Sequence, residues 1–276
     1  MACTESDYAY LRELVLKQSA NLIDPSRNSL FDAKLIPVVR RAGMSNLHEF
    51  VRLLQSERPT HLHRAVAEAM TINETSFFRD VKTFNLLREN ILPALVERRR
   101  SARRLRIWSA ASSTGQEAYS IAMLLAEHFP ETAYWDVKIL GTDISQRVVE
   151  YAMAGRYRRL EVNRGLPARM LLKYMTRHEE EWQISPRLRA MCDFQQVNLC
   201  GPLPSLPICD LVLLRNVLLY FSQQDRGHVF RAIHRLTATD GYLFLGNAEQ
   251  AEESTHHFQA EFSGDTFFYR PVSNGW

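Results

Sequence analysis

The sequence predicts an α/β protein in which a small helical domain precedes a mostly parallel, doubly wound sheet. Strand-like and helix-like segments alternate beyond residue 100, which is the pattern of consecutive βα units. At residues 107–125 a strand end, a run of small residues and a helix start follow one another directly. The segment 209–220 is almost continuously apolar, as in a strand that is covered on both faces.

Composition is that of a soluble globular protein. The 276 residues are 46% hydrophobic and 24% charged, with a net charge of +3, too mild to indicate nucleic-acid binding. No apolar stretch approaches the roughly 18 residues that span a bilayer, and the N-terminus lacks the layout of a signal peptide. We therefore expect a cytoplasmic protein with no membrane insertion. The four cysteines form no C-x-x-C pair, so we expect neither a metal site nor a disulfide framework.

The first seventy residues are predicted to form four short helices. Apolar residues recur at helical spacing in four segments, the second ending at Gly43 and the third starting after Ser45. Both are suitable capping residues. Pro37 lies in the second segment, where it could kink the helix or start a new turn. The pattern fits a binding module and a structural cap equally well.

Residues 70–80, MTINETSFFRD, combine polar groups with an apolar pair. Thr71 and Glu74 fit a capping box, whereas Asn73, Thr75 and Arg79 add groups suited to the lining of a cleft. Farther on, the approach to the first strand is crowded with arginines at 98–100, 103, 104 and 106. A basic patch for RNA is one interpretation. Favourable placement of cations at a helix C-terminus, in a solvated loop, is the better one.

The central stretch is residues 107–125, which read IWSAASSTGQEAYSIAMLL. The small residues 109–115 let bare backbone approach a ligand at a helix N-terminus. The stretch lacks the G-x-G-x-x-G pattern, so by itself it also fits a tight turn without a ligand.

Polar residues end two of the predicted strands. Asp143 ends the strand 135–144, where an acidic residue can accept both hydroxyls of a ribose; a solvated helix cap is the alternative. Arg215 and Asn216 interrupt the apolar run 209–220 at the sheet edge where ligands bind. A turn cap for Asn216 and a packed ring for Tyr220 are the structural alternatives.

The remaining elements complete an α/β pattern with an antiparallel tail. Helices are predicted at 145–154, 167–175 and 223–236, and main-sheet strands at 193–199 and 242–246. Two short strands at 174–176 and 182–184 suggest a small antiparallel excursion, and two further strands at 257–262 and 266–270 close the chain.

Taken in order, the chain contains MTINETSFFRD, IWSAASSTGQEAYSIAMLL, GTDI, VNL, LLRNVLLYF and DGYLFLGNAE. This set resembles the CheR-type chemotaxis receptor methyltransferases over residues 30–270. The resemblance implies a protein-glutamate O-methyltransferase that uses S-adenosyl-L-methionine and releases S-adenosyl-L-homocysteine. It implies a helical docking domain at 1–70, a linker at 71–90, and a Rossmann-like class I methyltransferase domain at 91–276. A three-stranded β-subdomain would be inserted at about 172–192.

The resemblance also implies roles for particular residues. It implies cofactor contacts from Asn73, Thr75, Arg79, Glu117, Asp143, Asn198, Leu199, Asn216 and Val217. Arg79 and Tyr220 would lie near the transferred methyl group as catalytic residues. Glu117 would engage the cofactor's ammonium, Asp143 its ribose, and residues 198–199 its adenine. The partner would be the cytoplasmic helices of a methyl-accepting chemoreceptor, docked on Lys34, Arg40 and Arg41, and the enzyme would act as a monomer.

The implied chemistry suits these residue types. A glutamate carboxylate is already ionised near neutrality, so methyl transfer to it needs no strong base. The enzyme has chiefly to align acceptor, methyl group and sulfur. Arg79 would orient the substrate carboxylate, whereas Asn216 and Tyr220 would position groups without ionising.

The sequence departs from the family pattern in two places that concern the partner. Residues 37–39 (Pro-Val-Val) replace part of the usual arginine-rich docking stretch. The predicted turn 177–181 is short and acidic, whereas members that bind a receptor's C-terminal pentapeptide tend to have a longer, glycine-bearing loop. We therefore expect no pentapeptide tethering. A receptor of a non-motility pathway, or a regulatory module without turnover, are the alternative functions.

Overall fold

A computed structural model describes residues 3–56, 58, 60–251, 256–264 and 266–272. The chain divides into two compact units. One comprises residues up to Ile72 together with Tyr220–Arg226, and the other comprises Asn73–Leu219 together with the residues from Gly227 onward. Of the segment 71–90, predicted as a linker, residues 73–90 thus belong to the larger unit.

The smaller unit contains the four predicted helices. They are α1 (Glu5–Ser19), α2 (Ser29–Arg41), α3 (Leu47–Ser56) and α4 (His61–Ala69), with a short 3-10 turn, η1 (Pro25–Arg27), before α2. Their apolar faces form one core, with Leu11, Val15, Phe31, Leu35 and Phe50 fully buried. α2 runs through Pro37 without interruption, so the proline does not start a new turn.

The larger unit is built on a seven-stranded sheet of order β6-β2-β1-β7-β8-β10-β9. Its strands are β1 (Arg104–Ala110), β2 (Asp136–Asp143), β6 (Cys192–Gln196), β7 (Cys209–Leu214), β8 (Thr237–Leu245), β9 (Phe258–Ser263) and β10 (Thr266–Pro271). β6, β2, β1, β7 and β8 are parallel to one another, whereas β10 is antiparallel to β8 and β9. The prediction of a parallel sheet with an antiparallel tail is confirmed.

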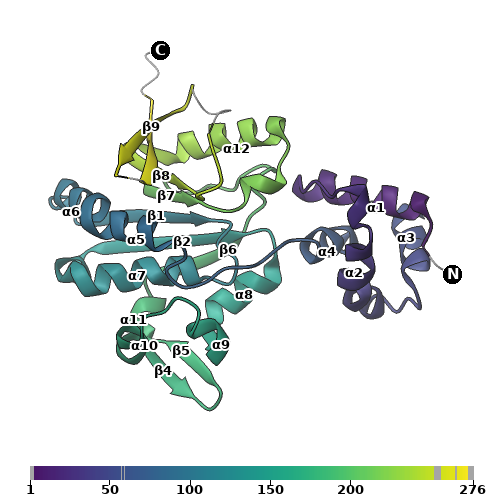
Figure 1. Cartoon of the computed structure of the whole chain (residues 1–276), viewed down its shortest axis with the longest axis horizontal. Coiled ribbons are helices and arrows are strands. Elements are labelled where there is room, and N and C mark those ends of the chain that lie inside the picture. Colours follow the sequence, from purple (N-terminus) through teal and green to yellow (C-terminus); the bar gives the residue numbers. More distant parts are fainter. Residues whose placement is uncertain (1–2, 57, 59, 252–255, 265, 273–276) are drawn as a thin grey trace. The chain divides into compact units, whose positions relative to one another are not determined.

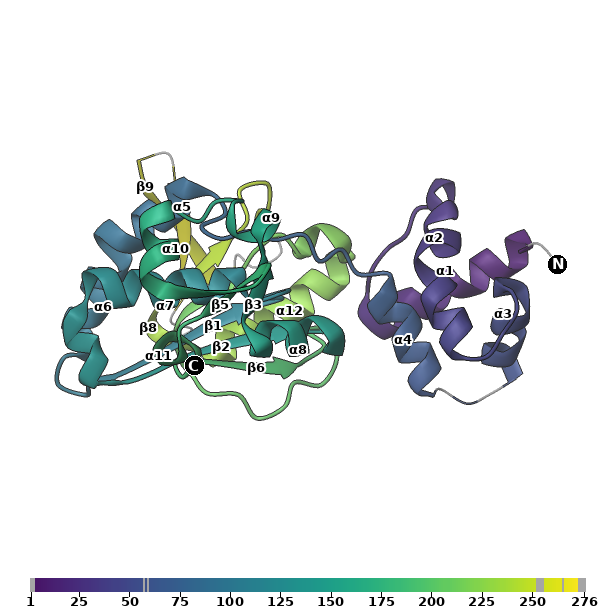
Figure 2. The same ribbon diagram turned by 90° about the horizontal axis from the view of Figure 1, so that it is seen from below.

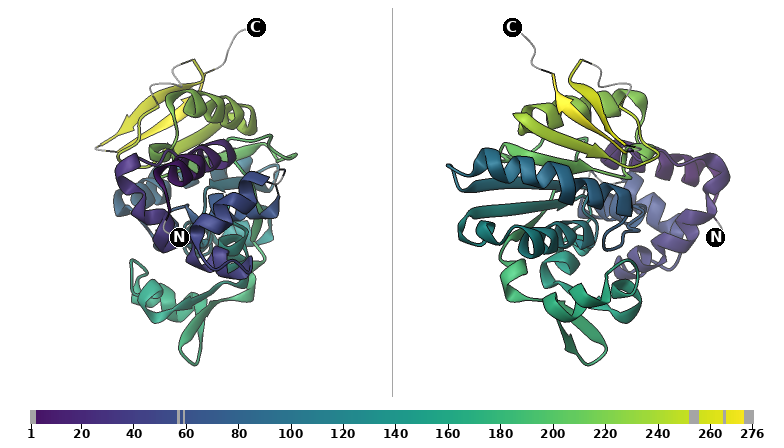
Figure 3. Two further views of the ribbon diagram at one scale, coloured as in Figure 1. Left: turned by 90° about the vertical axis from the view of Figure 1, so that its right-hand side faces the viewer. Right: turned by 60° about the vertical axis from the view of Figure 1, so that its left-hand side comes forward.

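Both faces of this sheet are covered. The helices are α5 (Val81–Leu86), α6 (Leu92–Arg99), α7 (Gln116–His128), α8 (Gln146–Ala154) and α12 (Gln223–Leu236). Three short helical segments lie between elements, η2 (Leu87–Ile91), η3 (Pro130–Tyr134) and η4 (Leu218–Tyr220). α5, α6 and α7 lie side by side along the sheet (Figures 1 and 3). Because successive strand residues point to opposite faces, burial of both Ile107 and Trp108 shows that the second face is covered too.

A second, three-stranded antiparallel sheet has the order β3-β5-β4. Its strands are β3 (Arg156–Arg158), β4 (Met175–His178) and β5 (Glu181–Ile184), accompanied by α9 (Arg159–Val162), α10 (Ala168–Tyr174) and α11 (Pro186–Arg189). The β4–β5 hairpin projects from the larger unit (Figure 1), and the view in Figure 2 brings α9 and α10 forward. The predicted range 172–192 misses β3, because a three-residue strand carries no periodic signal.

The strand predicted at 193–199 ends earlier than expected, whereas the end of the strand before Arg215 agrees with prediction. β6 ends at Gln196, so Asn198 and Leu199 lie in the following loop and not in a strand. β7 ends at Leu214, directly before Arg215, as predicted. The polar residues that follow both strands therefore lie at the carboxyl edge of the sheet.

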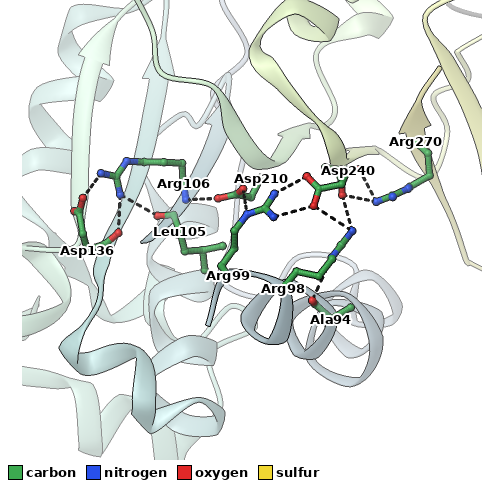
Figure 4. Close-up of polar contacts among 10 residues, drawn as sticks. Ala94, Arg98, Arg99, Leu105, Arg106, Asp136, Asp210, Asp240 and Arg270 are labelled. Atoms are coloured by element: carbon green, nitrogen blue, oxygen red, sulfur yellow. Dashed lines mark hydrogen bonds and ion pairs between the residues drawn. The ribbon is translucent and has the colours of Figure 1, made fainter. Parts of the chain in front are cut away.

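The arginine-rich approach to β1 is an ion-pair network (Figure 4). Arg99, in the last turn of α6, donates from Nε to Asp210 Oδ1 (2.6 Å) and from Nη2 to Asp240 Oδ1 (2.5 Å). Arg106 pairs with Asp136. Arg98 and Arg99 do lie at a helix C-terminus, as predicted, but Arg99 joins β7 to β8 through Asp210 and Asp240 and does not lie in a solvated loop.

Within the described residues, no helix is long and apolar enough to cross a membrane. The same residues contain no group of three or more His, Cys, Asp or Glu side chains arranged to hold a metal ion.

Candidate functional site

The site is built around the turn between β1 and α7. Three of its residues have left-handed backbones: Ala111 (φ 59°), Ser113 (φ 51°) and Gly115 (φ 91°). Alanine and serine are uncommon in that region, so the turn is held by its surroundings. The Ser112 N–H donates to the Thr142 carbonyl (2.8 Å), which ties the turn to the end of β2.

Asp143 is held against this turn at the carboxyl end of β2. Its carboxylate is 6% exposed and accepts the backbone N–H groups of Ser113 (2.9 Å) and Ser145 (3.0 Å). Its carbonyl accepts the N–H of Val197 (2.8 Å), which brings the loop with Asn198 alongside. Within that loop, Asn198 Oδ1 accepts the N–H of Cys200 (3.0 Å).

The segment 73–80 is anchored to the same turn and to α7. Ser113 Oγ donates to the Asn73 carbonyl (2.9 Å), and the Phe78 N–H donates to Ser120 Oγ (3.0 Å). The buried Phe77 ring packs edge-on against Tyr157, with 5.1 Å between ring centroids. Asn73, through its backbone carbonyl, and Asp143, through its carboxylate, therefore both contact Ser113.

Arg79 and Glu117 are connected through Arg215. The Arg215 guanidinium donates to Glu117 Oε2 (2.7 Å), to Asp80 Oδ2 (2.5 Å) and to the Arg79 carbonyl (3.0 Å). Ser109 Oγ also donates to Glu117 (2.7 Å). Arg79 itself is partly exposed, and its Nη1 donates to the Glu74 carbonyl (2.9 Å).

Asn216 is fixed by a buried carboxylate. Glu249, 2% exposed, accepts the N–H groups of Asn216, Leu218 and Gly246, each at 2.7 Å. Asn216 has φ 60°, a conformation that asparagine tolerates better than most residues. A Cβ on Gly246 would lie 2.6 Å from Asn216 Nδ2, so only glycine allows the two loops to approach this closely.

These groups fit the cofactor that the sequence resemblance implies. Asp143 is a buried carboxylate beside a bare-backbone turn, which suits two ribose hydroxyls. Glu117 is a second carboxylate on the first turn of α7, eight residues after Ser109, and can accept further N–H donors. Ser112 Oγ is buried and, among the described residues, has no hydrogen-bond partner, which leaves a polar group at the turn for a ligand or water.

The other predicted residues are distributed as follows. Leu199 is buried, and Thr75 and Val217 are half-buried, all in the larger unit. Tyr220 falls in the smaller unit, where its carbonyl accepts the Leu22 N–H (3.0 Å). Lys34, Arg40 and Arg41 lie on α2, also in the smaller unit. The roles of these residues stay predictions.

Sequence reasoning gave no role to Arg215, Asp80 or Glu249. The interruption of an apolar strand by arginine was the available signal, because a buried guanidinium requires carboxylate partners. Those partners lie 98 and 135 residues away, and no local pattern identifies them.

Comparison with known proteins gives the family of the chain. The family model described as "CheR methyltransferase, SAM binding domain" matches residues 73–267. The chain is similar to Chemotaxis protein methyltransferase 1 of Pseudomonas aeruginosa, with 33% identity over 98% of this chain and 99% of that protein. It is also 33% identical to Chemotaxis protein methyltransferase Cher2 of Pseudomonas putida, over 94% and 95% of the two chains.

Among solved structures, a TehB-like SAM-dependent methyltransferase from Corynebacterium glutamicum shares 14% identity with the chain, with a TM-score of 0.38. That match covers 69% of this chain and 92% of the other. The family match extends over the whole site and most of the larger unit. The chain belongs to the CheR methyltransferase family, and its larger unit is the family's S-adenosylmethionine-binding domain.

Proposed function

We propose that this enzyme methylates glutamate side chains on the cytoplasmic helices of a methyl-accepting chemoreceptor. The products would be glutamate methyl esters and S-adenosyl-L-homocysteine, formed in the cytoplasm by a monomeric enzyme. The observation that carries the proposal is the hydrogen bond from Arg215, at the carboxyl end of β7, to the backbone carbonyl of Arg79 (3.0 Å), which holds the segment of Arg79 at that edge of the sheet.

The residues of this chain perform binding and alignment. S-adenosylmethionine, when bound, supplies a methyl group on a positively charged sulfur. Asp143 would hold the ribose hydroxyls, Glu117 the ammonium group, and the loop of Asn198 and Leu199 the adenine. Asn216 is positioned at the same edge by Glu249.

Arg79 would bind the acceptor carboxylate. A guanidinium pairs with a carboxylate through two parallel N–H···O bonds, which fixes the direction of the reacting oxygen. Bound S-adenosylmethionine would supply the methyl group and retain the electrons of the carbon–sulfur bond on sulfur, and Arg79 would direct the acceptor oxygen toward that methyl group. No proton moves, so the site requires orientation and not a general base.

The test is methyl transfer to receptor fragments. The full chain is incubated with S-adenosylmethionine labelled in its methyl group and with a chemoreceptor cytoplasmic fragment. We expect label on the fragment that alkali releases as methanol, because esters hydrolyse in base. Alkali-stable label would indicate a different acceptor atom, and no transfer to any receptor fragment would favour a regulatory module.

A further inference from the structure

The buried guanidinium of Arg215 is the least expected group in the larger unit. Its side chain is 2% exposed and lies at the carboxyl end of β7, beside the ring of Phe84 (5.9 Å from Cζ to the ring centroid). Removing a guanidinium from water carries a large desolvation cost. An apolar side chain of the same length could fill this volume without that cost.

Arg215 is held between two carboxylates that belong to different parts of the site. Nη1 contacts Glu117 on α7, and Nη2 contacts Asp80 at the end of the segment 73–80. Nη2 also donates to the carbonyl of Arg79 (3.0 Å). The group therefore touches a predicted cofactor ligand on one side and the backbone of the predicted acceptor-binding residue on the other.

The charges in this cluster do not cancel. One guanidinium faces two carboxylates, so the Arg215–Asp80–Glu117 cluster carries one excess negative charge at the first turn of α7. This excess favours a cationic ligand group, while the Nη1 contact and the Ser109 hydroxyl restrict the orientation of the Glu117 carboxylate. A freely rotating carboxylate would lose entropy on binding that ligand.

The backbone conformation around Asp80 is a second feature of the site that depends on Arg215. Phe78 (φ 49°) and Asp80 (φ 64°) both have left-handed backbones on either side of Arg79, which is uncommon for such residues and persists only when surrounding contacts hold it. Arg215 contacts both Asp80 and the Arg79 carbonyl, and thereby supports this conformation.

We propose that Arg215 is a positioning residue with two separable tasks. Through Glu117 it prepares the site for the cofactor's ammonium group, and through Asp80 it sets the backbone that directs Arg79 at the acceptor. The first task rests only on cofactor binding by this family; the second rests on the proposed function. The Nε atom of Arg215 is buried without a partner among the described residues, so the two Nη atoms make the contacts that carry both tasks.

The first task is tested by calorimetric titration of S-adenosyl-L-homocysteine into the full-length variants Arg215→Met, Glu117→Gln and the double variant. We expect each single variant to bind about 10- to 100-fold more weakly, the range found when a supporting contact of a ligand-holding group is lost. The double variant should bind no more weakly than the weaker single variant, because both changes remove the same interaction. Additive losses would overturn the proposal.

Controls separate this role from a general loss of folding. Arg215→Lys keeps the charge but not the two-pronged geometry, so we expect intermediate affinity. Arg189→Met removes a guanidinium whose Nε is likewise buried without a partner, in α11, and should leave affinity within about twofold. If Arg215→Met does not fold, Arg215→Lys decides: affinity equal to that of the unaltered chain would contradict the proposal.

The second task is tested with Asp80→Asn. Asp80→Asn removes the excess negative charge of the cluster but leaves the Glu117 carboxylate in place, so we expect a smaller loss of S-adenosyl-L-homocysteine affinity than in Glu117→Gln, with kcat for a receptor fragment lowered at least tenfold. Unchanged kcat would overturn the second task. If the unaltered chain methylates no receptor fragment, the proposed function fails, whereas the calorimetric result for Glu117 stands independently.

Discussion

Arg79 gives the most direct residue-scale prediction. Arg79→Ala removes the only group assigned to the acceptor carboxylate, while Asp143 and Glu117 retain their contacts. We expect kcat/KM for a receptor fragment to fall at least 100-fold, about 3 kcal/mol of transition-state stabilisation, with cofactor affinity lowered far less. Methylation kinetics and calorimetry measure the two effects. Arg100→Ala, at an exposed arginine that pairs with Glu97, is the matched control; activity of Arg79→Ala close to that of the control would contradict the role.

Glu249 gives a second prediction at this scale. In the unaltered chain, the Glu249 carboxylate accepts three backbone N–H groups. Glu249→Gln replaces it with an amide, whose NH2 cannot accept them and whose oxygen carries no charge. We expect a loss of about 2 kcal/mol in the free energy of unfolding, measured by urea denaturation, and a raised KM for the cofactor through Asn216. Glu131→Gln, on an exposed side chain, should change neither quantity. Equal stability of the two variants would refute the account of Glu249.

At the residue scale, the sequence identified polar residues that follow strands but not the residues that they contact in the structure. The small-residue run and Asp143 were recognisable because both follow apolar strands directly in the sequence. Neither the Arg215–Asp80–Glu117 cluster nor the three N–H groups on Glu249 could be predicted, because each joins residues from separate elements. Such contacts depend on the packing of the whole unit.

At the scale of elements, α2 has fewer cations available for a docking partner than its sequence indicates. The Lys34 ammonium is half-buried and donates to the Thr71 carbonyl (2.8 Å), and burial lowers its pKa. The exposed Arg40 and Arg41 in the last turn are therefore the better candidates for contact with an acidic partner. Lys34 has a structural partner within its own unit.

We accordingly expect the double variant Arg40→Ala, Arg41→Ala to raise KM for a receptor fragment about three- to tenfold, with kcat unchanged. Exposed charge pairs contribute little each and are screened by salt, so the effect should shrink in 0.5 M salt. Arg52→Ala, an exposed arginine on α3, is the control. The docking assignment is wrong if KM is the same for all three proteins at low salt.

The β4–β5 hairpin supports the expectation of no pentapeptide tethering. Only Glu179 and Glu180 separate the two strands, and Glu179 has the positive φ (55°) of a tight two-residue turn. Titration of a chemoreceptor C-terminal pentapeptide should therefore give no binding heat at micromolar concentrations. A dissociation constant in the low micromolar range would disprove the prediction.

Element boundaries could be predicted from the sequence where the periodic pattern of apolar residues was long. The helix 223–236 matches α12, whereas β8 begins at Thr237, five residues before the predicted strand. Residues 237–241 (Thr-Ala-Thr-Asp-Gly) look like a turn in sequence, yet they extend the strand. Asp240 and Gly241 there accept hydrogen bonds from the arginines of Figure 4, and tertiary contacts of this kind override local propensity.

At the scale of the larger unit, carboxylates paired with arginine or lysine make stability dependent on pH. Glu127 on α7 accepts hydrogen bonds from Lys173 Nζ (2.5 Å) and Tyr174 Oη (2.7 Å) on α10. These bonds lower the pKa of Glu127 from 4.5 to about 2. A lowered pKa in the folded state means that the stabilisation is complete above about pH 4.5 and is lost as the pH falls toward 2.

Glu127→Gln tests this dependence. At pH 7 we expect the variant to be less stable than the unaltered chain by about 1–2 kcal/mol, a value discounted for its exposed lysine partner. At pH 3 the difference should be smaller, because the carboxylate of the unaltered chain is then almost fully protonated in the unfolded state, and folding must remove that proton. Urea denaturation at both pH values measures it. A difference that stays constant or grows on acidification would contradict the pairing.

The central claim concerns the acceptor atom, and mass spectrometry of a methylated receptor fragment tests it most directly. After reaction with the enzyme and S-adenosylmethionine, we predict peptides heavier by one methyl group, with the methyl on a glutamate side chain. The modification should disappear on alkaline treatment and in a fragment whose modified glutamate is replaced by alanine. Methyl groups on lysine, arginine or another base-stable position would contradict the account.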